Sequence, residues 1–401
     1  MKTSHALSLG ILLMLLAVLV ARSDSGMAGE PSRSNAAQPV PRPAIEKKDI
    51  EAIEWLLGGM IHCLGTSDPS RASEIRADWR RQVADLRHAY ETQNPALPQM
   101  VKRFMHDTAE PRMRDMRGGR PVYLLLGFHG AQLFEGDEYG YFEFDSPHMA
   151  ADRIVQILDL SDRCGVPVNL EFGLSSLRIL CRRYPELKQA LTRATRAGRA
   201  EIINSAYALP YGHLIRPESN LRQFEYGGQV YEELVGGRPN VYVFSEFSAF
   251  PQMPQVVKFF GIPNVGLRGR MGFGPSTPYP LIVWEGLDGT RVRALTQQTN
   301  TYSGEYYGMR FYQEIFALLV QAASGNPRDY ALYASLEDHP LVFASDNTEE
   351  AMRVSRFADV LGHHCTYSAL FEKGPAPSGI FRFPYDQSGL SGYKSKSGNW
   401  L

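Results

Sequence analysis

The sequence is poor in the residues and patterns that mark several common classes of protein. It has 401 residues but only four cysteines, Cys63, Cys164, Cys181 and Cys365, and no two have the CxxC spacing of a metal finger or redox site. Cys164 and Cys181 flank a predicted strand, so both a disulfide and a pair of free buried thiols fit the sequence. The formal net charge is −1, which gives no reason to expect nucleic acid or an anionic membrane surface as a partner.

Two further absences narrow the fold. No glycine-rich phosphate loop follows the first predicted strand, so a dinucleotide-binding fold is poorly supported. No repeat of fixed period runs along the chain, which argues against a solenoid.

The first residues have the pattern of a targeting segment. Lys2 supplies a positive charge, and an apolar stretch runs from Ala6 to Ala21. This stretch is short for a membrane-spanning helix and typical of a secretory signal peptide, predicted over residues 1–23. The sequence therefore predicts export to the periplasm or the extracellular space, with no stable membrane insertion unless the signal stays uncleaved as an anchor. Residues 24–44 are rich in Ser, Gly, Ala and Pro and are predicted to be a disordered linker.

Two regions follow the linker. Residues 45–118 form a helical region, because apolar side chains recur at helical spacing, as Ile75, Trp79 and Val83 do. From residue 119 to 401, apolar strands alternate with amphipathic helices, which implies βαβ units and a parallel sheet. About seven such units predict a β/α barrel with an N-terminal helical extension; an open doubly wound sheet is the alternative.

Polar residues follow the predicted strands at their carboxyl ends, where α/β barrels place their chemistry. His129 ends the first strand, Glu171 the second, Ser245 and Glu246 the fourth, and Glu337 with Asp338 the seventh. Carboxylates and a histidine around one cavity suit acid–base, nucleophilic or metal chemistry. Each residue also has a structural interpretation: His129 as a core histidine, Glu171 as a partner of a neighbouring arginine such as Arg268, and the late acids as loop or capping residues.

Five segments occur in a familiar order. They are GFHGA at 127–131, GRAEIINSAYALPYG at 198–212, PESNLRQ at 217–223, SEFSAFPQMP at 245–254 and WEGLDGT at 284–290. In this order the chain from about residue 121 to 400 resembles the N-terminal catalytic domain of glycoside hydrolase family 38, the α-mannosidase family. The resemblance implies a seven-stranded parallel β/α barrel of the glycoside hydrolase/deacetylase type.

The resemblance also implies a retaining glycosidase with a bound zinc. His129 matches a metal-binding histidine, whereas Ala131 and Ser245 stand where the family has a ligand aspartate and the nucleophile aspartate. Serine cannot replace an anionic ligand or a carboxylate nucleophile. The predicted metal ligands are therefore His129 and Glu246, and both a zinc site and a site without metal stay open.

The same comparison assigns the catalytic residues. Glu246, adjacent to Ser245, is the predicted nucleophile, metal ligand or both, provided that the strand ends or bulges at Ser245. Asp338 matches the general acid/base, with Glu337 as the alternative. Six residues are predicted to bind a carbohydrate substrate: Glu171, Tyr211, Arg222, Arg268, Trp284 and Phe134.

The sequence leaves other functions open. The vacant acid positions suit a non-catalytic carbohydrate-binding or scaffold protein on the same fold. A metal-dependent deacetylase-like hydrolase is a further alternative, but it would need a His-x-x-x-His or Asp-Asp pair, which the sequence lacks. A homo-oligomer that completes the cleft from a second subunit also fits.

Overall fold

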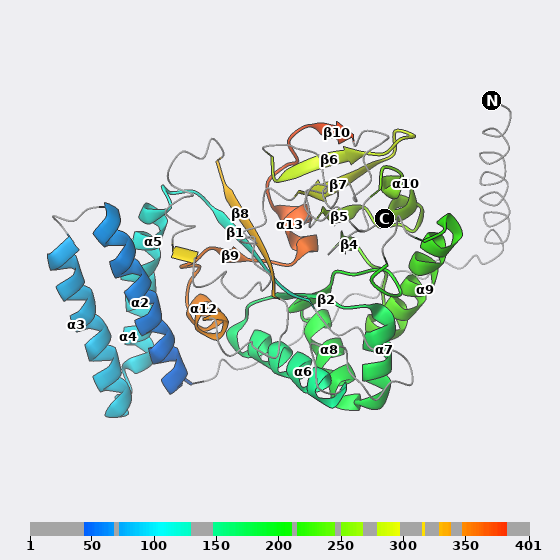
Figure 1. The fold of residues 1–401 in the computed structure, drawn as a ribbon. Coiled ribbons are helices and arrows are strands. Elements are labelled where there is room, and N and C mark those ends of the chain that lie inside the picture. Colours follow the sequence, from blue (N-terminus) through cyan, green and yellow to red (C-terminus); the bar gives the residue numbers. More distant parts are fainter. Residues whose placement is uncertain are drawn as a thin grey trace, which may run out of the picture. The chain divides into compact units, whose positions relative to one another are not determined.

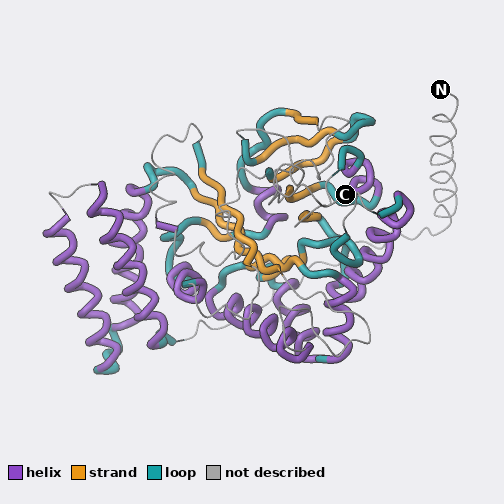
Figure 2. Tube along the Cα trace, viewed as in Figure 1, coloured by secondary structure: helices purple, strands orange, loops and turns teal. Residues whose placement is uncertain are grey.

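Two β-sheets, the helices that cover them and a group of N-terminal helices make up the described structure, which is a computed structural model (Figures 1 and 2). It describes residues 44–67, 72–129, 147–210, 215–244, 250–267, 279–296, 315–316, 329–337 and 347–382. The predicted signal peptide at 1–23 and the predicted linker, apart from Ala44, lie outside these ranges. The part of the chain they cover falls within one compact unit, Arg42–Leu401.

The first sheet is built on a long buried strand, β1 (Val122–His129). Its order is β3-β2-β1-β8, with every neighbouring pair parallel, as the alternation of strands and helices predicted. The other strands are β2 (Val168–Glu171), β3 (Ala200–Ile202) and β8 (Ala331–Glu337). A two-residue strand, β9 (His363–His364), pairs with the start of β1, before β2 begins to pair with it.

The second sheet has the order β10-β6-β7-β5-β4. Its strands are β4 (Val241–Phe244), β5 (Asn264–Leu267), β6 (Leu281–Glu285), β7 (Arg291–Leu295) and β10 (Ile380–Arg382). The residues Gly286-Leu287-Asp288-Gly289 predict a hairpin turn, and the antiparallel pairing of β6 with β7 confirms it. Gly289 has φ +88 there, and the Thr290 N–H donates to Asp288 Oδ1 over 2.8 Å, so the turn has the residues its backbone requires.

The two sheets are linked where β3 and β4 approach each other. The Val243 N–H donates to the Ile203 carbonyl over 2.8 Å, so β4 continues the strand sequence that starts with β8. The α/β class with a parallel sheet is therefore confirmed. Within the described ranges, β8 and β10 remain the two outer strands of this series, so closure into a seven-stranded barrel stays a prediction.

Helices connect the strands, and most follow the predicted ranges. They are α6 (Pro147–Cys164), α7 (Leu174–Arg183), α8 (Pro185–Arg196), α9 (Pro217–Val235), α10 (Met253–Phe259), α12 (Thr348–Ser355) and α13 (Tyr367–Lys373). The amphipathic pattern over 174–197 by itself predicts one helix, which is wrong, because the chain breaks at Tyr184, with φ −126 and ψ 89. Pro185 disfavours helical backbone in the residue before it and then suits the first turn of α8.

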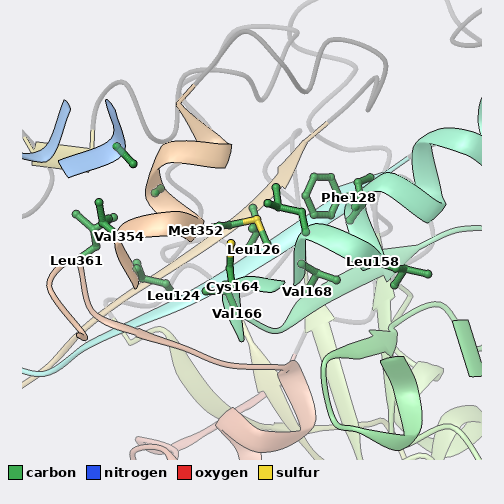
Figure 3. Close-up of a cluster of buried hydrophobic side chains, with 14 of the residues drawn as sticks. Leu124, Leu126, Phe128, Leu158, Cys164, Val166, Val168, Met352, Val354 and Leu361 are labelled. Carbon is green, nitrogen blue, oxygen red and sulfur yellow. The ribbon is translucent and has the colours of Figure 1, made fainter. Parts of the chain in front are cut away.

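Alternate residues of β1 face opposite sides of the first sheet. Leu124, Leu126 and Phe128 are fully buried in a cluster with residues of α6 and α12, such as Leu158 and Met352 (Figure 3). We call this side the helix-covered face. Burial of each of these side chains contributes about 1.5–3 kcal/mol, which fixes the strand's register against the helices.

The opposite side, here called the inner face, has its own apolar cluster. Leu125 of β1 joins Val241 and Val243 of β4 and residues of β6, β7 and β8. The 363–373 segment, which contains β9 and α13, adds Tyr367 and Leu370 to this cluster. Apolar side chains thus cover the inner face along the first part of β1, and polar groups lie at the carboxyl end of that strand.

The N-terminal helices pack onto the α/β region through α12. They are α2 (Lys47–Ser67), α3 (Ala72–Glu91), α4 (Leu97–Arg103), a π-helical turn (Phe104–Ala109) and α5 (Glu110–Met116). Arg353 of α12 is 4% exposed and contacts Asp49 of α2, which is 0% exposed, with Arg353 Nη1 to Asp49 Oδ1 at 3.0 Å. The predicted helical region is therefore joined to the sheet by a buried ion pair.

Two expectations concern cysteine and the membrane. All four cysteines are free and buried, so the structure has no Cys164–Cys181 disulfide. Burial raises the pKa of each of the thiols of Cys164, Cys181 and Cys365 to about 12. Among the described helices, none combines the length and the apolar character needed to span a membrane.

Candidate functional site

A histidine and a glutamate meet at the carboxyl edge of the first sheet. His129 ends β1 and Glu171 ends β2, and the parallel register sets these two residues directly side by side. His129 Nδ1 lies 2.6 Å from Glu171 Oε2. The histidine side chain is 13% exposed and the glutamate side chain 0%. A short, buried hydrogen bond between two titratable groups at a strand edge has the geometry of a catalytic or ligand-holding pair.

The second carboxylate oxygen of Glu171 has different surroundings. Glu171 Oε1 is buried and has no hydrogen-bond partner in the part of the chain that the structure describes. Leaving such an atom unpaired costs about 1–3 kcal/mol, more for a charged group. Local folding alone does not account for a carboxylate placed in this way, which makes Glu171 a candidate for a functional role.

The loop after β3 forms the neighbouring rim. The Asn204 side chain donates from Nδ2 to the Phe172 carbonyl over 3.0 Å and to the Ala208 carbonyl over 3.1 Å. It thereby ends β3 at Ile202, whereas the run AEIINSAY at 200–207 by itself predicts an eight-residue strand. Gln223 of α9 fixes the same loop, because its Oε1 accepts the Ala208 N–H over 2.8 Å. Sequence reasoning missed both residues, although an asparagine in a buried apolar run signals such a backbone contact.

Two other predicted substrate residues have clear positions. Arg222 lies on the exposed surface of α9 and pairs with Glu225 over 2.7 Å and with Glu218 over 3.6 Å. Trp284 lies in β6, 0% exposed, in a core cluster with Tyr242 and Phe224. In this structure Trp284 therefore packs the core, whereas Arg222 is open to solvent.

Most of the remaining predicted site residues are not described by the structure. Glu246, Asp338, Tyr211, Arg268 and Phe134 lie outside the described residues. Glu337 ends β8, and its backbone is paired in register with Phe128, one residue before His129. The last residues of β1, β2 and β8 thus share one edge, as predicted for a parallel sheet.

A second buried glutamate lies on the inner face, farther from this edge. Glu201 of β3 accepts hydrogen bonds from the Ser368 hydroxyl and from the Ser368 N–H, the latter over 2.9 Å. Ser368 is in the first turn of α13, where the helix dipole favours a negative charge. Burial raises the pKa of the Glu201 carboxyl, and the hydrogen bonds from Ser368 act against that rise.

The zinc that the resemblance implies can be tested against these residues. Among the described side chains, no three His, Cys, Asp or Glu residues gather into a metal site. His129 nevertheless fits a ligand, because a metal-binding histidine normally donates its other ring N–H to a carboxylate, as the contact with Glu171 provides. The described residues therefore fit one oriented imidazole ligand.

Part of the chain matches the model of a known protein family. Residues 169–364 match the family model described as the glycosyl hydrolases family 38 N-terminal domain. The predicted family 38 resemblance is confirmed. The matched range includes Glu171, Glu201, the loop after β3 and the whole of β8.

A curated relative agrees with this result. The chain is 26% identical over 125 residues to alpha-mannosidase G of Dictyostelium discoideum. The match covers 30% of this chain and 11% of the relative, so the chain spans about a tenth of that protein's length.

Two solved structures are similar to part of the chain. A 4-alpha-glucanotransferase from Thermococcus litoralis superposes with a TM-score of 0.50 at 16% identity, covering 66% of this chain and 42% of that one. An alpha-mannosidase from Enterococcus faecalis gives a TM-score of 0.45 at 20% identity, covering 66% of this chain and 30% of that one. The first of these supports the α/β fold with its parallel sheet.

Proposed function

We propose that the protein is an exported glycoside hydrolase that cleaves α-mannosidic bonds. The observation that supports this most strongly is the buried His129–Glu171 pair at the carboxyl edge of a family 38 type sheet. The curated relative is an alpha-mannosidase, and the predicted signal peptide supports export.

The roles of the residues follow from the family pattern. Glu246 acts as the nucleophile or as a metal ligand, and Asp338, or Glu337, acts as the general acid/base. A retaining mechanism needs these carboxyl groups about 5–5.5 Å apart, and an inverting one about 6.5–9.5 Å. Arg222, Tyr211 and Phe134 bind the hydroxyl groups and ring faces of the sugar, whereas Trp284, buried in the core, does not.

A zinc ion, when bound, would supply a Lewis acid that holds and polarises substrate oxygen atoms. His129 would hold it, with Glu246 as the carboxylate ligand. The described part of the protein contributes the orientation of the His129 ring, through Glu171, and a dry apolar wall along the inner face.

Hydrolysis of aryl glycosides by the purified full-length chain tests this function. We expect release of nitrophenol from the α-mannoside and not from the corresponding β-mannoside or α-glucoside. Glu246→Gln should lower kcat/KM at least about 100-fold, the lower end of what one positioned carboxyl group contributes.

Glu232→Gln is the matched control, because Glu232 is an exposed glutamate on α9. It should keep the wild-type rate. Equal activity of Glu246→Gln and the wild type would remove Glu246 from the mechanism. A chain that binds mannosides but hydrolyses none of the three substrates would instead support a carbohydrate-binding protein on the same fold.

A further inference from the structure

We propose that Glu171 is a positioning residue, which fixes the orientation and the tautomer of His129. The sequence suggests a substrate contact for this glutamate, but its side chain is 0% exposed and its Oε2 atom lies 2.6 Å from His129 Nδ1. Glu171 therefore acts through the histidine.

The sheet itself sets this geometry. His129 and Glu171 are direct register partners, so the ladder of parallel hydrogen bonds holds their Cα atoms side by side. Both residues are on the inner face, since Phe128 and Leu170, their neighbours in sequence, are buried on the helix-covered face. The imidazole can be held without any loop having to close.

The chemistry of the pair determines where the ring proton lies. A carboxylate has only acceptor atoms, so the hydrogen bond to Glu171 places a proton on His129 Nδ1. The other ring nitrogen, Nε2, is then the atom that carries the lone pair in the neutral ring. Glu171 thus selects the nitrogen that can take up a proton or hold a cation.

Burial makes the arrangement specific. Among the described residues, the His129 ring is the one hydrogen-bond partner of the Glu171 carboxylate, because Oε1 has none there. Glu201, the buried glutamate of the next strand, is instead bonded through both oxygens to Ser368. Both oxygens of Glu201 are thus bonded to one residue of α13, whereas Glu171 is bonded through one oxygen, to the histidine.

Nitrogen NMR of the full-length protein labelled at its histidine ring nitrogens tests the proposal without any substrate. The His129 signals are identified by their loss in His129→Gln. We expect a proton on His129 Nδ1 in the wild type. An Nδ1 atom without a proton would overturn the proposal, and this measurement needs no Glu171 variant to fold.

Variants extend the test. In Glu171→Gln the amide can donate to Nδ1 as well as accept from it, so the ring signals should shift toward the tautomer with its proton on Nε2. Glu201→Gln, which neutralises the other buried glutamate, should leave the His129 signals unchanged. Unchanged His129 signals in Glu171→Gln, with the fold intact by circular dichroism, would also overturn the proposal.

The kinetic consequence rests on the proposed function. Loss of a residue that orients a ligand or base costs about 10- to 100-fold in activity. We expect Glu171→Gln to lower kcat by this factor with KM nearly unchanged, since Glu171 does not touch the sugar. If the chain hydrolyses no glycoside but His129 still responds to Glu171, the proposed reaction fails and the positioning role stands.

Discussion

Glu171 and Glu201 are buried glutamates on adjacent strands of one sheet, and they have opposite surroundings. Glu201 accepts hydrogen bonds through both oxygens from Ser368, at the start of α13. Glu171 is bonded through one oxygen to His129, and its other oxygen has no partner in the described structure.

Glu201 has the surroundings of a structural residue, and Glu171 has those that we propose for a functional one. Glu201 attaches the 363–373 segment to β3, and its hydrogen bonds offset much of the cost of burying a carboxyl group. Glu171 remains incompletely bonded at the edge where the strands end. Incomplete hydrogen bonding, rather than burial alone, separates Glu171 from Glu201 and is the basis on which we propose a role for Glu171.

The largest expected effect comes from removing the better-bonded glutamate. Glu201→Ala takes away both acceptors of Ser368 and leaves a cavity on the inner face, so it should lower the free energy of unfolding by about 3 kcal/mol. Urea denaturation followed by circular dichroism measures this loss. Glu201→Gln, which keeps the volume and one acceptor, should cost about 1 kcal/mol. Equal stability of all three proteins would mean that Ser368 does not anchor the segment through Glu201.

A second expected effect is a change of folding stability with pH, which comes from His364 in the segment that Glu201 attaches to β3. Burial lowers the pKa of His364 to about 4 from an ordinary value of 6.5, against the charge of Asp359, which raises it. The folded protein therefore prefers neutral His364, and this contribution is present above pH 6.5 and lost as the pH falls toward 4. Relative to His364→Gln, wild-type stability should fall by up to about 1.4 kcal/mol per pH unit over that range.

Urea midpoints between pH 4 and 7.5 provide the measurement. The exposed neighbour His363, 3.4 Å from Asp359, serves as the control, because His363→Gln leaves the buried ring in place. A His364→Gln protein with the same pH dependence as the wild type would contradict the assignment.

The smallest expected effect concerns the cap of α13. The Thr366 hydroxyl accepts the Ala369 N–H over 3.2 Å at the helix start that faces Glu201. Thr366→Ala should cost about 1 kcal/mol in urea denaturation, with Thr366→Ser close to the wild type. The His129 ring signals should not change in either variant, since the cap belongs to the structural glutamate. A change in those signals would show that the two glutamates are coupled.

The strand pattern could be predicted from the sequence where apolar runs and turn residues agree. The apolar run at 122–128 and the turn at 286–289 gave β1 and the β6–β7 hairpin. The break at Tyr184 and the early end of β3 were missed. The break at Tyr184 depends on a single proline, Pro185, within an otherwise amphipathic pattern. The early end of β3 depends on the Asn204 amide, whose hydrogen bonds with backbone distant in sequence outweigh strand propensity.

The candidate site could be predicted in part. The sequence placed His129 and Glu171 at strand ends, but it could not pair them, because that depends on the register between β1 and β2. Register is set by which side chains pack against α6 and α12, a tertiary property. The burial of Trp284 could not be predicted for the same reason. The sequence around a tryptophan beside a turn does not tell whether its side chain faces a substrate or the core.

The ion pair between Asp49 and Arg353 has a consequence for synthesis. These residues are 304 positions apart, and each has a side chain almost fully removed from water in the folded protein. At a translation rate of about 5–20 residues per second, Asp49 is made about 15–60 s before its arginine. During that interval the carboxylate of Asp49, which is buried in the folded protein, has no Arg353 to neutralise it.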